Sequence, residues 1–207
     1  MPDTRALLSS GLTELNLDFS SEQLQQLLDY IALMQKWNGT HNLTTIKTEE
    51  DIATLHFLDS LSIADWIIGN TILDVGAGAG LPSIPLAIAC PEKHFTLVDS
   101  SSKRVAFLQT VKASLNLNNV AAIHSRIEDL QSRAFEHIVS RAFSSLKQFV
   151  ESSHHVLGDN GNWLAMKGQH PTEELAELDS KMTAEAIELS VPGLDAERYL
   201  VVIKQIS

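Results

Sequence analysis

The stretch from Thr71 to Ser83 limits what this chain can fold into more than any other part of the sequence. Residues 71–75 (Thr-Ile-Leu-Asp-Val) have the apolar run typical of a buried strand in a parallel sheet. Three glycines follow with one residue between each pair: Gly76, Gly78 and Gly80. Residues 84–89 then predict a helix, whose first turn tolerates the two prolines of the segment. A strand, a glycine-rich turn and a helix start in this order expose backbone to a ligand, so we expect a cofactor to bind here.

Two other nucleotide-binding patterns do not fit this turn. A dinucleotide-binding fold has Gly-x-Gly-x-x-Gly, and here Leu81 takes the place of the third glycine. A Walker loop ends in Gly-Lys-Ser/Thr, which this segment lacks. The pattern from Asp74 to Gly80, Asp-x-Gly-x-Gly-x-Gly, instead resembles class I S-adenosylmethionine (SAM)-dependent methyltransferases.

A second acidic residue supports a nucleoside site. Residues 94–99 (His-Phe-Thr-Leu-Val-Asp) predict the next strand, and Asp99 ends it 25 residues after Asp74 (99 − 74). A carboxylate at that place can accept hydrogen bonds from both ribose hydroxyls of an adenosine, as in NAD and SAM sites. The two acids together with the glycine spacing favour SAM over NAD.

Strands and helices alternate from residue 71 onward, which predicts an α/β fold with a mostly parallel, seven-stranded, Rossmann-like sheet. The expected strands cover 71–75, 94–99, 120–124, 136–140, 161–168, about 183–191 and about 198–205, the last two as an antiparallel hairpin. A capping box at Ser20 and Gln23 starts a helix in the preceding part of the chain, and Gly39 is expected to end it. Another helix is expected at about 144–157. We expect an N-terminal helical extension at 1–68 and a methyltransferase domain at 69–207, packed as one globular unit.

The overall charge argues against a general binder of nucleic acid. The formal net charge is −11, whereas such binders present a broad basic surface. A local basic patch is still compatible with this charge. Lys103 and Arg104 begin the helix that follows Asp99, at the sheet edge where ligands bind. They are either ordinary solvated helix charges or contacts for a phosphate backbone.

Other features of the sequence indicate where the protein is located and whether it binds a metal. Cys90 is the only cysteine, which fits a reducing cytoplasm, and no apolar run has the length of a membrane span. His154 and His155 are adjacent, so on a helix they point about 100° apart, which is poor geometry for a chelate. No other cluster has the spacing of metal ligands, and we predict no metal.

The sequence does not decide the roles of two pairs of residues. A helix is expected from Thr48, with an apolar face made of Ile52, Leu55, Leu58, Leu61 or Ser62, Ile63 and Trp66. His56 and Asp59 lie near that face, either as a hydrogen-bonded polar pair or facing the cofactor cleft. Ile127 and Glu128 follow the third strand, where they either contact the adenine or simply start a helix.

The residues after the fourth strand lie where donor and acceptor must meet. Arg141 and Phe143 could grip or stack on a nucleobase there and so position the substrate. The alternative is that Phe143 belongs to the core and Arg141 to a structural ion pair. The Asn/Asp-Pro-Pro-aromatic motif of many amino-methylating enzymes is missing, which makes methylation of an exocyclic amine less plausible.

Several segments in order carry a resemblance to one family. They are Trp37-Asn-x-x-His-Asn-Leu-Thr44, His56-x-x-Asp-Ser60, Asp74-Val-Gly-x-Gly-x-Gly-Leu-Pro-x-Ile-Pro85, Leu97-Val-Asp-Ser100 with Lys103-Arg104, Ser140-Arg-Ala-Phe143 and Met166-Lys-Gly168. Together they resemble the bacterial 16S rRNA (guanine-N7) methyltransferase family RsmG, also called glucose-inhibited division protein B. The likeness spans nearly the whole chain.

The resemblance implies an activity, a partner and a set of site residues. It implies SAM as methyl donor, N7 of guanine 527 in 16S rRNA as acceptor, and a monomer that meets the rRNA or the small ribosomal subunit through a basic patch including Lys103 and Arg104. The implied cofactor-binding residues are Asp74, Gly76, Gly78, Leu81, Asp99, Ile127, Glu128 and Arg141. Four residues of the Trp37–Thr44 segment would cap the methionine pocket or contact RNA: Trp37, Asn38, Asn42 and Thr44.

The implied reaction needs no general base. Guanine N7 carries a lone pair and no proton, so it can attack the methyl group directly, and the rate comes from in-line alignment. Two other functions fit the sequence less well. One is a SAM-dependent methyltransferase acting on a small molecule or a protein, which would suit the negative charge. The other is a SAM- or RNA-binding module without catalytic activity.

Overall fold

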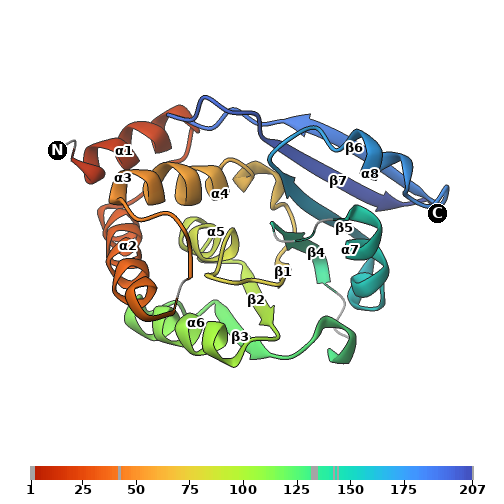
Figure 1. The fold of residues 1–207 in the computed structure, drawn as a ribbon, viewed down its shortest axis with the longest axis horizontal. Helices are drawn as coiled ribbons and strands as arrows, with labels where there is room; N and C mark the ends of the chain where they lie inside the picture. Colours follow the sequence, from red (N-terminus) through yellow and green to blue (C-terminus); the bar gives the residue numbers. More distant parts are fainter. Residues whose placement is uncertain (1–2, 42, 132–134, 142, 144, 207) are drawn as a thin grey trace.

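The computed structural model describes residues 3–41, 43–131, 135–141, 143 and 145–206. Its centre is a seven-stranded sheet in the order β3-β2-β1-β4-β5-β7-β6 (Figure 1). The strands are β1 Thr71–Val75, β2 His94–Asp99, β3 Val120–His124, β4 Phe135–Ser140, β5 Leu157–Lys167, β6 Met182–Glu188 and β7 Tyr199–Gln205. β1 to β5 are parallel, and β7 is antiparallel to both β5 and β6. The predicted fold class is confirmed, including the antiparallel hairpin at the end of the chain.

Alternate residues of each strand supply two cores, one on each face of the sheet. In β1, Ile72 belongs to the larger core, whereas Leu73 and Val75 belong to the smaller one. The same alternation holds in β7, where Leu200 faces the larger core and Val201 the smaller. Because β1 is central and covered on both faces, its residues 72–75 are all buried, as expected for a strand in a parallel sheet.

The helices are divided between the two faces. Their bounds are α1 Thr4–Glu14, α2 Ser21–His41, α3 Glu49–Ile52, α4 Asp59–Leu61, α5 Ser83–Ala89, α6 Ser102–Ser114, α7 Leu146–Ser153 and α8 Thr172–Ala176. Residues of α1 to α6 contribute to the larger core, and α7 packs on the smaller one (Figure 1). The N-terminal helices therefore share a core with the sheet, and α2 contacts both α5 and α6.

The helix expected from Thr48 is not regular. A π-helical turn, Ala53–Leu58, separates α3 from α4, and a short 3₁₀ helix, Ala64–Trp66, follows. A π turn shifts the side chains that come after it, because each turn holds more residues than an α turn. Phe57 is consequently fully buried, whereas Leu55 is only half-buried and Trp66 is 37% exposed. The expected apolar face was wrong at Leu55 and Trp66.

Three other boundaries differ from the prediction. α2 continues past Gly39, where we expected it to end. The helix expected at 144–157 is only α7 plus a short 3₁₀ turn, His154–Val156, and β5 begins at Leu157 rather than at Gly161. Within the described part of the chain, no helix is both long and apolar enough to cross a membrane.

Candidate active site

The glycine-rich loop, residues 76–82, is folded back onto the end of β2. The backbone N–H groups of Gly76 and Ala77 donate to the carbonyl of Val98 over 2.9 and 3.1 Å. Gly78 and Gly80 have φ values of +59° and +86°, which residues with a side chain rarely adopt. These glycines let the loop turn sharply between β1 and α5, directly above the carboxyl ends of β1 and β2.

Asp99 is bonded to this loop directly. The N–H of Gly78 donates to Asp99 Oδ2 over 2.9 Å, and the N–H of Ser101 donates to Oδ1 over 2.8 Å. Arg104 Nη1 lies 3.4 Å from Oδ2, with its own side chain 55% exposed. The two acids of the predicted cofactor site thus lie on adjacent strands, and Asp99 also holds the glycine-rich loop against the start of α6.

The space beside Gly78 fits a bound ligand. A Cβ built on Gly78 would meet only the carbonyl oxygen of Gly76, at 3.8 Å, so the loop is open on that side. A Cβ on Gly80 would instead lie 2.5 Å from Ile84 Cγ1 and 2.8 Å from Leu108 Cδ2. Gly80 is therefore needed for packing against α5 and α6, whereas Gly78 leaves room at the surface of the loop.

Asp74 is an unusual buried carboxylate under the loop. It is 1% exposed, and neither oxygen has a hydrogen-bond partner of ordinary geometry among the described residues. Burial raises the pKa of Asp74 to about 7, an effect that the nearby Ser83 and the cation of Arg141 only partly offset. A buried carboxylate that these neighbours stabilise only partly is suited to a cationic ligand, which would stabilise its ionised form.

Tyr30 of α2 fixes the other side of the glycine-rich loop. Its hydroxyl donates to the carbonyl of Ala79, and its ring stacks on Phe57 with centroids 4.9 Å apart. The side chain is fully buried, and burial raises the pKa of the hydroxyl above its usual value. Sequence reasoning missed this residue, although Tyr30 lies three positions after Leu27 on the buried stripe of α2.

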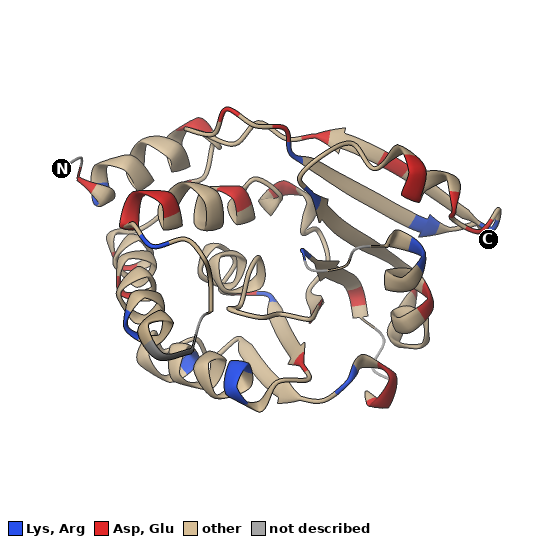
Figure 2. Ribbon diagram, viewed as in Figure 1, with Lys and Arg blue, Asp and Glu red and all other residues tan. Residues whose placement is uncertain are grey.

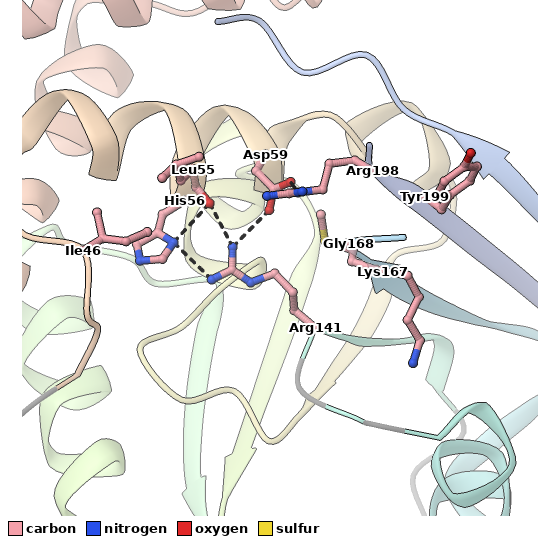
Figure 3. A pocket seen from close by; sticks show the side chains of 10 residues that line it. Ile46, Leu55, His56, Asp59, Arg141, Lys167, Gly168, Arg198 and Tyr199 are labelled. Carbon is pink, nitrogen blue, oxygen red and sulfur yellow. Dashed lines mark hydrogen bonds and ion pairs between the residues drawn. The ribbon is translucent and has the colours of Figure 1, made fainter. Parts of the chain in front are cut away.

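Arg141 lies at the carboxyl end of β4 and joins the residues of the N-terminal helices (Figure 3). Its Nη1 donates to Asp59 Oδ2 over 3.1 Å and to the carbonyl of Leu55 over 3.3 Å. Its Nη2 lies 3.2 Å from His56 Nδ1. His56 and Asp59 are therefore both partnered by Arg141 rather than by each other, and this part of the structure agrees with the structural ion pair considered for Arg141.

His56 is neutral in this cluster. Burial and the neighbouring Arg141 cation lower its pKa to about 4. Its Nε2 lies 2.8 Å from Thr44 Oγ1, and the N–H of Thr44 donates to the side chain of Asn38 over 2.9 Å. The polar contacts thus run without a break from the end of α2 to β4, through residues that the sequence motifs had singled out. Asn42, another of these, lies outside the described residues.

A second arginine, which sequence reasoning missed, completes the cluster. Arg198 Nε donates to Asp59 Oδ1 over 2.9 Å, so the Asp59 carboxylate lies between two guanidinium groups. Arg198 precedes β7 and is separated from Asp59 by 139 residues. No local pattern marks it, because it is one basic residue in an acidic stretch of the sequence.

Phe143 packs toward the smaller core. Its ring contacts that of Phe149 in α7, with centroids 5.1 Å apart, which agrees with the alternative of a core residue. Lys167 Nζ donates to the carbonyl of Phe143 over 3.0 Å and lies 2.7 Å from Glu174 Oε2. The segment after β4 is thus tied to β5 and α8, and a role of Phe143 in positioning substrate stays a prediction.

The remaining predicted residues lie around the same edge of the sheet. Ile127 is buried and Glu128 is exposed in a 3₁₀ turn, Ile127–Asp129, after β3. Lys103 is exposed on the first turn of α6, and Leu81 is buried in the glycine-rich loop. Trp37 packs against Phe107 of α6 with ring centroids 5.4 Å apart. Among the residues that the structure describes, no group of three or more His, Cys, Asp or Glu could hold a metal ion.

Comparison with known proteins decides the family. The model of the family described as rRNA small subunit methyltransferase G (GidB) matches residues 23–201. This chain belongs to that family. Relatives named ribosomal RNA small subunit methyltransferase G are 45% identical over 204 residues in Marinobacter nauticus and 44% over 195 residues in Methylobacillus flagellatus. These alignments cover 98% and 94% of this chain and 95% of each relative, so the predicted resemblance is confirmed.

Solved structures agree with this assignment at the level of the fold. A putative SAM-dependent methyltransferase from Methanococcus maripaludis is similar with a TM-score of 0.58 and 16% identity, over 86% of this chain and 92% of that one. A SAM-dependent O-methyltransferase from Thermotoga maritima has a TM-score of 0.57 and 12% identity, over 84% and 71%. The described part of this chain therefore has the fold of these two proteins, and its membership of the rRNA small subunit methyltransferase G family makes it a methyltransferase.

Proposed function

We propose that this chain transfers a methyl group from SAM to N7 of guanine 527 in 16S rRNA. The observation that carries the proposal is the bond from the Gly78 N–H to Asp99, next to the open space on the outer side of Gly78. It places a glycine backbone and a buried carboxylate together, as an adenosyl group requires. Family membership supports the rRNA acceptor, because the relatives are named for that substrate.

Different residues on this edge of the sheet would contact different parts of the cofactor. Asp99 would accept hydrogen bonds from the ribose hydroxyls, and Ile127 with Glu128 would meet the adenine. The backbone of Gly76, Gly78 and Leu81 would contact the rest of the cofactor. Asp74 would lie beneath this backbone, and Arg141 would lie beside it at the end of β4. When bound, SAM would supply an electrophilic methyl group on a cationic sulfur.

The chain itself has little chemistry to perform. Guanine N7 attacks with a lone pair that carries no proton, so no side chain has to remove one. Arg141 is cationic and bonded to Asp59, and His56 is neutral, which suits holding groups in place more than proton transfer. Alignment of the reacting atoms can supply roughly 7–11 kcal/mol of the barrier reduction. We assign the catalytic contribution to positioning by the ends of β4 and β5.

The rRNA would approach on the side of α6. Lys103 is exposed there, and Arg104 is more than half exposed although it lies near Asp99. Figure 2 shows basic residues on α6, whereas acidic ones mark α3 and the segments of α8 and β6. A local basic surface beside the cofactor site would therefore exist on a chain of net charge −11.

Transfer from labelled SAM tests this proposal. The purified protein is incubated with small ribosomal subunits and with naked 16S rRNA from cells that lack the gene, and the product is mapped by chemical cleavage at 7-methylguanine. We expect label at guanine 527 in at least one of the two substrates. Label at another base, or only on a protein or small molecule in the mixture, would contradict the proposal.

A further inference from the structure

A cavity of 320 Å³ opens beside Arg141 (Figure 3). It lies between the π-helical turn, the ends of β4 and β5 and the start of β7. Ile46, Leu55 and Met166 give it apolar walls, and Arg141 and Arg198 give it polar groups. Cavities of this size with mostly apolar walls and a few placed polar groups are typical of sites for small ligands.

The polar groups of this cavity carry an excess of hydrogen-bond donors. Arg141 and Arg198 share the single carboxylate of Asp59, so the three side chains have a net charge of +1 (two cations, one anion). Lys167 also lines the cavity, but its amine is bonded to Glu174 and to the carbonyl of Phe143. Both Asp59 oxygens are occupied, so this cluster offers donors rather than acceptors to a ligand.

Arg198 has the more available donors of the two arginines. Arg141 uses both terminal nitrogens on Asp59, His56 and the Leu55 carbonyl. Arg198 uses Nε on Asp59 and Nη1 on the carbonyl of Glu197, over 2.9 and 2.7 Å. Its Nη2 has no partner among the described residues, and 23% of its side chain is exposed.

The position of the cavity and the chemistry of N7 methylation narrow the choice of ligand. The acceptor must reach the carboxyl edge of the sheet, where β4 and β5 end at this cavity. The N7 lone pair has to stay free in order to attack, so the protein must hold the purine by another atom. Guanine presents the acceptor O6 next to N7, whereas adenine presents an amino group that donates at the same place.

We propose that this cavity receives the acceptor guanine and that Arg198 is a specificity-determining residue, with its free Nη2 donating to O6. The proposal rests on the proposed function, because it assumes that the acceptor is a guanine. The apolar walls cover the ring, and Asp59 orients both guanidinium groups from below. An adenine in this pocket would place its amino group against the guanidinium group, leaving both donors without an acceptor.

The test compares two substrates in two forms of the enzyme. Small subunits are reconstituted with 16S rRNA that carries guanine or 2-aminopurine at position 527, the latter made by ligating a synthetic segment. 2-Aminopurine keeps N7 and lacks O6. Initial rates of methyl transfer are measured for the wild type, Arg198→Ala and Arg198→Lys. Arg5→Ala, which removes an exposed arginine of α1, is the matched control.

We expect the wild type and Arg5→Ala to prefer guanine by about tenfold or more, and Arg198→Ala to lose most of this preference. Any difference in intrinsic reactivity between the two bases cancels, since it is the same for each enzyme. If Arg198→Ala does not fold, Arg198→Lys keeps the cation beside Asp59 and should still reduce the preference at least threefold.

Two outcomes would overturn the proposal, and they differ. If Arg198 only holds Asp59 in place, its replacement slows both substrates equally and the preference is unchanged, which removes the pocket assignment alone. If the wild type forms no 7-methylguanine on the guanine substrate, the proposed function fails as well.

Discussion

The hydroxyl of Tyr30 donates to the carbonyl of Ala79, so a helix of the N-terminal segment is bonded to the middle of the glycine-rich loop. The tyrosine ring stacks with the rings of Phe57 and Phe107, with centroid distances of 4.9 and 6.3 Å, and is fully buried. A buried ring held in this way can adopt few positions. The conformation of the loop is therefore set partly by residues that precede the sheet by about forty positions (71 − 30).

Tyr30→Phe should lower both stability and SAM affinity. The change leaves the Ala79 carbonyl without this donor, which costs about 1–3 kcal/mol when the group is buried. Thermal unfolding and calorimetric titration with SAM measure the two effects. We expect SAM affinity to fall several-fold. Thr110→Val, which removes a hydroxyl bond on the exposed face of α6, is the control and should change neither. Unchanged SAM affinity in Tyr30→Phe would show that the loop does not need this bond.

The glycines of the loop should separate a binding role from a packing role. Gly78→Ala places a methyl group in open space beside the loop, so it should reduce SAM affinity at least tenfold with a stability loss of about 1–2 kcal/mol from its positive φ. Gly80→Ala drives a methyl group into Ile84 and Leu108, so its stability loss should reach about 3 kcal/mol or more. Calorimetry and denaturant unfolding compare the pair. The assignment is wrong if Gly78→Ala binds SAM normally.

SAM binding should release protons through Asp74. The pKa of this carboxyl is raised to about 7 by burial, so near pH 7 about half of the molecules carry a proton on it. A cationic ligand favours the ionised form, so binding should release about half a proton and tighten as the pH rises from 6 to 8. Titrations in buffers of different ionisation enthalpy measure this number. Asp74→Asn should release none, and the exposed Asp129→Asn should behave as the wild type. Equal release in Asp74→Asn would rule out this source.

Stability should depend on pH through His56. Its pKa is lowered from 6.5 to about 4 in the folded protein, so the unfolded chain binds the extra proton between these values. Stability therefore falls as the pH drops through this window, and this group lowers it by about 2 kcal/mol between pH 7 and pH 4.5. Denaturant unfolding at several pH values should show a weaker dependence in His56→Gln. The exposed His94→Gln is the control, and the same pH profile in all three proteins would contradict the assignment.

The central strands and the loop could be predicted because their signals are local. The buried run of β1, the glycine spacing and the acid at the end of β2 each lie within a few residues of sequence. Parallel strands bring their carboxyl ends to one edge of a sheet, so Asp74 and Asp99 were expected near each other. The structure adds that Asp99 bonds the N–H of Gly78, a contact across 21 residues that no spacing rule specifies.

The cluster around Asp59 could not be predicted in the same way. Its partners Arg141 and Arg198 follow by 82 and 139 residues and come together only through the sheet order. The π-helical turn at 53–58 also hides the pattern, because it breaks the helical period from which the orientation of His56 and Leu55 was inferred. The choice between the two interpretations of His56 and Asp59, a hydrogen-bonded pair or residues facing the cofactor cleft, therefore depended on tertiary contacts.

The most direct measurement is the 7-methylguanine content at position 527 of 16S rRNA from cells without the gene, complemented by the wild type or by Asp99→Asn. Replacing the Asp99 carboxylate weakens its bonds to the Gly78 and Ser101 N–H groups and removes the predicted ribose contact. We predict that the modification is absent without the gene, restored by the wild type, and reduced at least tenfold with Asp99→Asn expressed at an equal level. Full modification in cells that lack the gene would contradict the account.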